Sequence, residues 1–138
     1  MRLPRIGKTY KRQKNFVFVE IRKSELLSAL KKLAEAGITR IADIAGYDNG
    51  KEIELIYRLP FDRERKLLNL KVRISRKNPS IKSATGIFPS AYIYERESFE
   101  LIGVKFEGHP HLERMLLART SPAKPLMKKQ QTMKEVKN

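Results

Sequence analysis

The two histidines of this chain, His109 and His111 on either side of Pro110, are the side chains best suited to acid–base or metal chemistry. Histidine is the most common protein metal ligand and general base. Two histidines that flank a proline have neither helical nor strand spacing for shared ligation, and the nearby carboxylates, Glu107 and Glu113, complete no known ligand pattern. This spacing predicts an imidazole that orders a tight loop rather than a metal site.

A second candidate for acid–base work is the acidic cluster of Glu95, Glu97 and Glu100, which also contains Arg96. On a helix, Glu97 and Glu100 share a face while Glu95 points elsewhere, so the spacing predicts no close pair of carboxylates. We therefore interpret the cluster as a set of ion-pairing groups.

The composition excludes further classes of chemistry. The sequence has no cysteine, which excludes disulfides, a thiolate metal site, cysteine-ligated iron–sulfur clusters and a cysteine nucleophile. The glycines form no phosphate-binding or dinucleotide-binding loop, because Gly46, Gly50 and Gly86 each stand alone. We expect this chain to carry no redox chemistry and no nucleophile of its own.

Apolar periodicity predicts the elements that hold these residues. Residues 16–21, rich in aromatic and β-branched side chains, are typical of a buried strand. The next segment predicts a helix that Ser24 caps, that has leucines at spacings of three and four, and that Gly37 ends. Residues 90–102 have a second helical pattern, which Gly103 ends.

Between the two helices the pattern is that of strands. After a strand-type segment over residues 38–47, the dipeptide Asn49-Gly50 favours a type I′ hairpin turn. Residues 51–59 and 66–76 alternate apolar and polar side chains, which predicts two strands that each bury one face. The predicted fold class is α+β: an antiparallel sheet of about four strands with a helix packed on one face, then a second helix and an extended C-terminal arm.

The charge of the chain is concentrated at its two ends. Of the 138 residues, 30 are Lys or Arg and 15 are Asp or Glu, a formal net charge of +15. Residues 1–15 hold six basic side chains and no acidic one, and residues 119–138 hold six basic and one acidic. Both ends lack the large apolar residues of a core. We predict a basic N-terminal arm over residues 1–15, a folded domain over 16–118 and a basic, extended C-terminal arm over 119–138.

This charge leaves open an alternative function as a basic RNA- or DNA-binding module. An RNA-binding sheet would present aromatic residues between its basic ones, and the strand face that carries Lys71 and Arg73 has none, so nucleic acid is not the favoured partner. A hydrolase that uses His109 or His111 is a weaker alternative. The longest uncharged stretch, residues 83–94, is too short and too polar to span a bilayer, so we expect a soluble, intracellular chain.

The segment over residues 80–116 resembles the signature region of the 30 kDa subunit family of respiratory complex I, the NADH dehydrogenase, which also occurs in membrane-bound energy-converting hydrogenases. The matching positions include a charged triplet, a glycine after the helix and a Gly-His-Pro turn; eleven of them are Glu95, Arg96, Glu97, Glu100, Gly103, Phe106, Gly108, His109, Pro110, Leu112 and Arg114. Two positions depart from the family pattern. His111 stands where the family usually has an acidic residue, and Glu113 stands where it usually has a basic one.

The resemblance implies an α+β, non-catalytic subunit of the hydrophilic arm of an ion-translocating oxidoreductase, held peripherally on the cytoplasmic side of the membrane. The implied partners are a large subunit of the 49 kDa or nickel-iron type, a small iron–sulfur subunit and, indirectly, membrane subunits. Iron–sulfur clusters, and a nickel-iron centre where the large subunit is of that type, are expected in those partners, and no cofactor in this chain. The eleven matching residues are expected at the subunit interface, and the short chain fits compact archaeal or bacterial versions.

Overall fold

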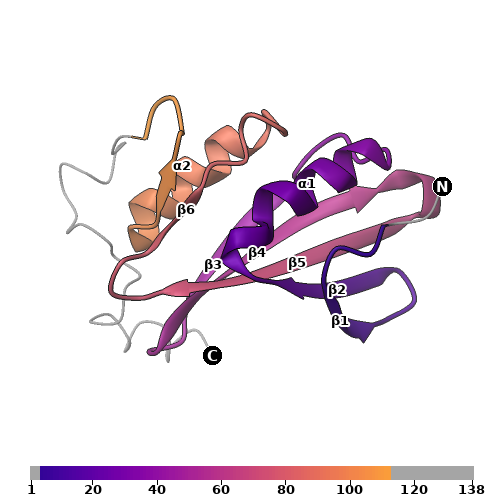
Figure 1. Ribbon diagram of the computed structural model, residues 1–138, viewed down its shortest axis with the longest axis horizontal. Helices are drawn as coiled ribbons and strands as arrows, with labels where there is room; N and C mark the ends of the chain where they lie inside the picture. Colours follow the sequence, from indigo (N-terminus) through magenta and orange to yellow (C-terminus); the bar gives the residue numbers. More distant parts are fainter. Residues whose placement is uncertain (1–3, 113–138) are drawn as a thin grey trace.

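The computed structural model describes residues 4–112, which form a twisted sheet with two helices on one of its faces (Figure 1). The main sheet of the described residues has five strands in the order β1-β2-β5-β4-β3, and β6 and β7 pair in a small parallel sheet. The elements in chain order are β1 (Lys8–Arg12), β2 (Phe16–Ile21), the 3-10 turn η1 (Lys23–Glu25), α1 (Leu26–Glu35), β3 (Asp43–Asp48), β4 (Glu52–Phe61), the 3-10 turn η2 (Asp62–Glu64), β5 (Lys66–Ser75), β6 (Ser80–Lys82), α2 (Ala91–Ile102) and β7 (Lys105–Glu107). This arrangement confirms the predicted α+β class.

The long strands β4 and β5 form the middle of the core. They pair antiparallel over ten residues, with Leu55 opposite Val72 and Tyr57 opposite Leu70. One face of each strand is buried beneath the helices, and the other face is only partly covered. The alternation in the sequence predicted this division, because successive side chains of a strand point to opposite faces.

The sheet is mixed, which differs from the antiparallel sheet of about four strands that we predicted. β2 pairs parallel with β5, with Val19 opposite Leu70. The chain leaves β2 through α1, and a helical crossover brings the next strand back in the direction of the first. The β3–β4–β5 meander then reverses direction twice, so β5 also runs parallel to β2.

The fifth strand, β1, lies within the segment predicted as a basic arm. It pairs antiparallel with β2, and all five of its residues are exposed. Aromatic and cation–π contacts also hold this strand: the Tyr10 ring lies 6.0 Å from that of Phe18, and Lys71 Nζ lies 5.1 Å from the Tyr10 ring centroid. Apolar periodicity in the sequence does not reveal such contacts. The predicted C-terminal arm over residues 119–138 lies outside the described residues.

The ends of α1 differ in how well the sequence predicted them. Gly37 ends the helix at a φ of 110°, as expected. Ser24 does not cap it, because that residue lies in η1. Instead, Glu25 Oε1 accepts the backbone N–H of Arg22 at 2.8 Å at the start of the turn.

The hairpin between β3 and β4 is not the predicted type I′ turn. Of the dipeptide, only Gly50 has a positive φ, of 91°. The Asn49 side chain makes the difference: its Oδ1 accepts the backbone N–H groups of Lys51 at 2.8 Å and of Glu52 at 2.7 Å. These bonds stabilise a longer loop, as asparagine commonly does in turns.

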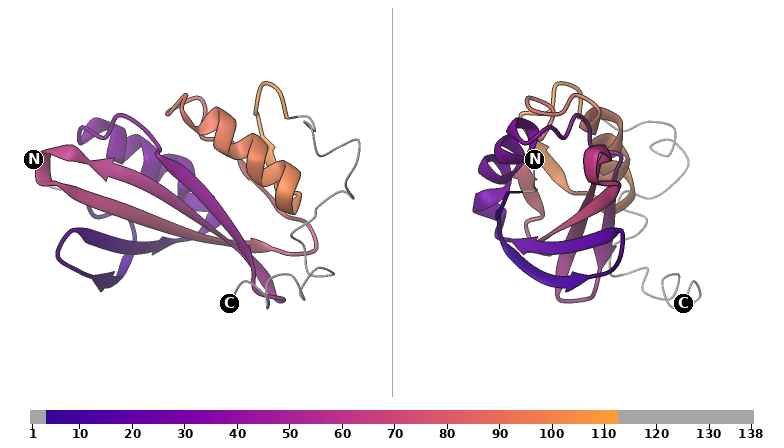
Figure 2. Two further views of the ribbon diagram at one scale, coloured as in Figure 1. Left: turned by 180° about the vertical axis from the view of Figure 1, so that it is seen from behind. Right: turned by 90° about the vertical axis from the view of Figure 1, so that its right-hand side faces the viewer.

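Both helices cover the same face of the sheet, and β6 and β7 run beside α2 (Figure 2). Gly46 of β3 allows the close approach of α2, because a Cβ at this position would collide with Cδ1 of Ile102. β3 is therefore the strand on which the second helix rests.

Candidate functional site

Glu95 lies in the interior of the domain, with a fully buried side chain on α2. Its Oε1 atom lies 2.7 Å from Ser83 Oγ, and its Oε2 atom accepts the backbone N–H of Ala84 at 2.7 Å. The structure therefore differs from the predicted ion-pairing role: two neutral donors hold this carboxyl and attach the segment after β6 to the helix.

Burial raises the pKa of Glu95 to about 7, although the hydrogen bonds from Ala84 and Ser83 lower it in part. When protonated, Oε1 can donate to Ser83 Oγ while Oε2 keeps the Ala84 N–H. The neighbouring Tyr57 hydroxyl is buried and has no hydrogen-bond partner among the described residues. Burial and then the charge of Glu95 raise the pKa of Tyr57 well above its ordinary value.

Arg96 is half-buried and faces the ring of Tyr92, with its Cζ atom 5.8 Å from the ring centroid. Its Nε atom is buried and has no hydrogen-bond partner among residues 4–112. Ile93 and Glu97 lie on the same helix and are exposed, with 42% of Ile93 open to solvent. Residues three or four apart are neighbours on a helix, so these side chains form one continuous surface.

His109 joins the loop after β7 to the start of α2. Its Nε2 atom lies 2.9 Å from the carbonyl oxygen of Tyr92, and its Nδ1 atom lies 3.0 Å from the backbone nitrogen of His111. A backbone N–H can only donate, so Nδ1 is the acceptor and Nε2 carries the hydrogen that Tyr92 receives. The imidazole ring also lies 4.7 Å from the Tyr92 ring. These contacts confirm the predicted role of a histidine that orders a tight loop.

Two glycines and a phenylalanine of the motif shape the chain around this loop. Gly103 ends α2 at a φ of 77°, and its N–H donates to the carbonyl of Phe99 at 2.9 Å. Gly108 turns the chain after β7 at a φ of 92°. Between them, Phe106 is buried in the core. Positive φ values favour glycine, so the backbone conformation explains why glycine stands at both positions.

The structure divides the predicted interface residues by exposure. Those that are buried are Glu95, Glu100, Gly103 and Phe106. Those that reach the surface at least in part are Arg96, Glu97, Gly108, His109, Pro110 and Leu112. Arg114 lies outside the described residues. We call the surface formed by Tyr92, Ile93, Arg96, Glu97, His109 and His111 the motif surface.

Sequence reasoning missed the groups that organise this site. Ser83 and Ala84 hold Glu95, and Tyr92 contacts both histidines, with its hydroxyl 3.0 Å from His111 Nδ1. The only signal for Ser83 was its place in a turn-rich segment, which does not specify a partner. Tyr92 could have been found from its helical position four residues before Arg96.

Neither a metal site nor a membrane span is found in the described part of the chain. Within residues 4–112, no three His, Asp or Glu side chains lie close enough together to hold a metal ion. No helix in that range is long and apolar enough to cross a bilayer.

The protein is therefore a small α+β domain with helices packed on one face of a sheet. Carboxyl and imidazole groups of its motif hold two loops in place and so shape one surface of the domain. The chain belongs to the 30 kDa subunit family of the respiratory-chain NADH dehydrogenase, whose family model matches residues 19–136.

Individual relatives agree with this assignment. The chain is 36% identical over 107 residues to the C subunit of NADH-quinone oxidoreductase from Moorella thermoacetica, covering 75% of this chain and 72% of the relative. It is 44% identical over 70 residues to the C/D subunit of the same enzyme from Yersinia enterocolitica, covering 51% of this chain but only 12% of that longer protein.

Two solved structures share the fold. A trypsin-resistant fragment of Nqo5 superposes with a TM-score of 0.64 at 24% identity, covering 70% of this chain and 83% of the fragment. A chain of the membrane-bound sulfane sulfur reductase, an archaeal respiratory membrane complex, superposes with a TM-score of 0.82 at 21% identity, covering 96% of this chain and 84% of that chain.

Proposed function

We propose that this protein is a non-catalytic structural subunit of the hydrophilic arm of a membrane-bound, ion-translocating oxidoreductase. In this role it packs against the large catalytic subunit through the motif surface and stabilises the assembly for electron transfer. The large subunit is of the 49 kDa or nickel-iron type, and a small iron–sulfur subunit belongs to the same complex. The iron–sulfur clusters, and a nickel-iron centre where the large subunit has one, reside in these partners, on the cytoplasmic side of the membrane.

The observation that carries this proposal is the incomplete environment of Arg96. Its Nε atom is buried and has no hydrogen-bond partner among the described residues. A buried polar atom without a partner costs about 1–3 kcal/mol. Unlike the Tyr57 hydroxyl in the core, Arg96 Nε belongs to a side chain that reaches the surface, where a group beyond the described residues can supply the missing bond. Exposed Ile93 beside it supplies an apolar contact, and exposed Glu97 can pair with a basic side chain of the partner.

The test is to tag the chain in its native host, solubilise the membranes gently, and quantify the subunits that co-purify. Arginines at the centre of an interface commonly contribute about 2 kcal/mol or more. The Arg96→Ala and Glu97→Ala variants should therefore recover much less of the large subunit than the unmodified chain does.

The matched control is the Lys32→Ala and Glu35→Ala pair, which removes one exposed cation and one exposed anion from α1. This pair should leave recovery of the large subunit unchanged. Equal recovery with the Arg96→Ala and Glu97→Ala variants would show that the motif surface is not the interface.

A nucleic-acid function is weaker, because the charges on the open face of the sheet are balanced. Tyr10 and Phe18 do place aromatic rings on this face, where Lys71 Nζ lies 5.1 Å from the Tyr10 ring centroid. However, Arg73 Nε lies 3.4 Å from Glu20, and Lys71 Nζ lies 3.7 Å from Glu54. These carboxylates would repel phosphates, so we expect no binding to single-stranded RNA beyond that of a generic basic protein.

A further inference from the structure

A hollow of about 1080 Å³ lies at the end of the sheet where the chain begins, at the opposite edge from α2. Its floor lies over Val17, Val19 and Leu68, which are core side chains that are each at most 5% exposed. One wall is the segment over residues 4–7, and another is β1. The hollow is thus separate from the motif surface, which lies on the helix that packs against β3.

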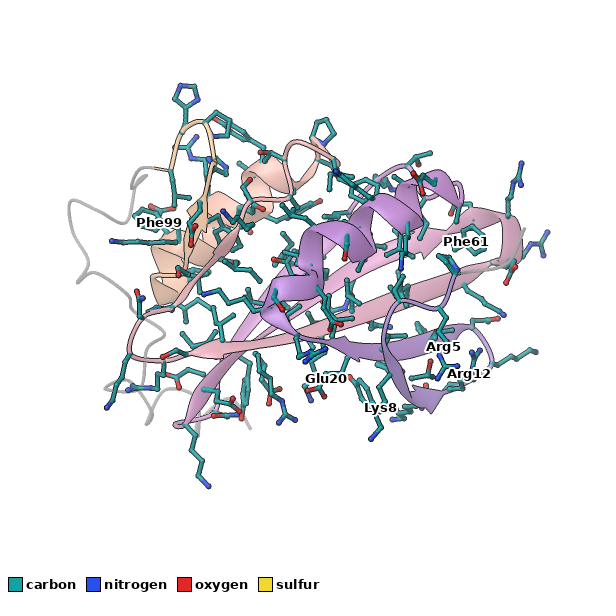
Figure 3. The ribbon with its side chains drawn as sticks, viewed as in Figure 1. Arg5, Lys8, Arg12, Glu20, Phe61 and Phe99 are labelled. Atoms are coloured by element: carbon teal, nitrogen blue, oxygen red, sulfur yellow. The ribbon has the colours of Figure 1, made fainter. Side chains whose placement is uncertain are left out.

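The rim of the hollow carries an excess of positive charge. Four basic side chains line it, namely Arg5, Lys8, Arg12 and Lys66, against one acidic side chain, Glu64. Glu64 Oε1 lies 3.2 Å from Lys66 Nζ, so this carboxylate is already paired. Arg5, Lys8 and Arg12 have no ion-pair partner in the described part of the chain, and Figure 3 shows their side chains at the same end of the molecule beside β1.

Gly7 sets the position of the first wall. A Cβ on this residue would lie 2.5 Å from Ile21 Cγ2 and 2.6 Å from the carbonyl oxygen of Glu20. Only glycine lets the segment approach β2 this closely, while Ile6 packs against the core. The wall is therefore held in place by packing, although Arg5 itself is exposed.

The chemistry of the hollow suits a peptide more than a nucleotide. Its lining contains no aromatic ring on which a base could stack. Outside the strand ladders, no backbone–backbone hydrogen bond joins residues 4–7 to the rest of the described chain. A main-chain group without such a bond can pair with the main chain of an extended segment, and acidic side chains of that segment can reach the charged rim.

We propose that this hollow binds an acidic, extended segment of a partner protein. Carboxylates of the segment contact the exposed side chains of Arg5, Lys8 and Arg12, and its main chain runs along the wall over residues 4–7. This inference goes beyond the proposed function, because it concerns a second surface at the other edge of the sheet. A chain with both surfaces can bridge two partners.

The test uses the purified full chain and a fluorescent octapeptide of alternating glutamate and valine, with anisotropy read at 0.15 M salt. The hollow variant is Arg5→Glu with Arg12→Glu. Its matched control is Lys31→Glu with Lys32→Glu, which makes the same change in net charge on the exposed side of α1. The hollow variant should weaken binding by at least about fivefold, and the control by less than about twofold, because exposed charges act mainly on close partners.

Two further measurements separate this site from general attraction between charges. Gly7→Ala changes the wall without changing the charge and should also weaken binding, and an octapeptide of alternating glutamine and valine should bind weakly. Equal losses in the two charge variants, or full binding by Gly7→Ala, would overturn the proposal. So would an eight-nucleotide oligouridylate that binds as tightly as the acidic peptide and depends equally on Arg5 and Arg12. None of these outcomes bears on the motif surface.

Discussion

Glu95 accepts the backbone N–H of Ala84 at a distance of 2.7 Å, and this bond ties the segment after β6 to the second helix. The carboxyl group is fully buried, and Ser83 is its other partner. A glutamate in the charged triplet of the motif therefore acts as an internal connector, while its neighbours Arg96 and Glu97 face the surface. Disruption of the connector is expected to move the motif surface as well.

The first prediction concerns how stability depends on pH. The pKa of Glu95 rises from 4.5 to about 7 on folding, so between these pH values the unfolded chain releases a proton that the folded chain retains. The contribution of protonated Glu95 to the free energy of unfolding is complete below pH 4.5 and is lost as the pH rises through about 7. The free energy of unfolding should fall by about 3 kcal/mol over this range. Glu95→Gln resembles the protonated form and should remove this decline, as measured by urea unfolding of the full chain between pH 5 and 8. Glu97→Gln, an exposed neighbour, should retain it; an unchanged slope in Glu95→Gln would contradict the prediction.

The second prediction compares the two histidines. His109→Ala removes both the bond to the Tyr92 carbonyl and the acceptor for the His111 N–H, so the free energy of unfolding should fall by about 1–2 kcal/mol. His111→Ala keeps its backbone N–H and loses only exposed contacts with Tyr92, namely the bond to its hydroxyl and an edge-on ring contact, so its cost should be below about 0.5 kcal/mol. Denaturant unfolding measures both values. Equal losses would mean that His109 does not hold the loop.

The third prediction concerns the contact between β3 and α2. Gly46→Ala places a Cβ against Ile102 Cδ1, which should destabilise the protein by about 1–3 kcal/mol. Ile102→Val removes the colliding methyl group. In a double-mutant cycle, Ile102→Val should cost less in the Gly46→Ala background than in the wild type. Additive effects would show that the helix does not rest on Gly46.

The fourth prediction is that Tyr57→Phe leaves stability unchanged or raises it by about 1 kcal/mol. The hydroxyl of Tyr57 is buried and has no partner in the described structure, so its removal relieves a desolvation cost and keeps the ring. Tyr57→Leu also loses the ring and should destabilise the protein. Thermal unfolding of both variants checks this, and a loss above about 1 kcal/mol in Tyr57→Phe would reveal a partner for the hydroxyl.

Much of the fold could be predicted from local patterns. The alternation in β4 and β5 and the leucine stripe of α1 correctly indicated which faces are buried. Gly37 and Gly103 correctly marked the helix ends, because a left-handed residue after a helix favours glycine. Three strands were not predicted: β1, which has no apolar face, and β6 and β7, which are three residues long. Segments this short or this exposed give no periodic signal.

The sequence by itself determined the fold class, the family motif and the charge of the ends, since each depends on residue types at fixed spacing along one chain. Tertiary structure alone decided the parallel pairing of β2 with β5, the burial of Glu95 and the assembly of the basic hollow. These features depend on contacts between segments far apart in sequence. Ser83 lies twelve residues before Glu95 and Arg12 more than fifty before Lys66, and no local period relates such positions. Only the packing of the sheet and helices determines which of these groups contact each other and which become buried.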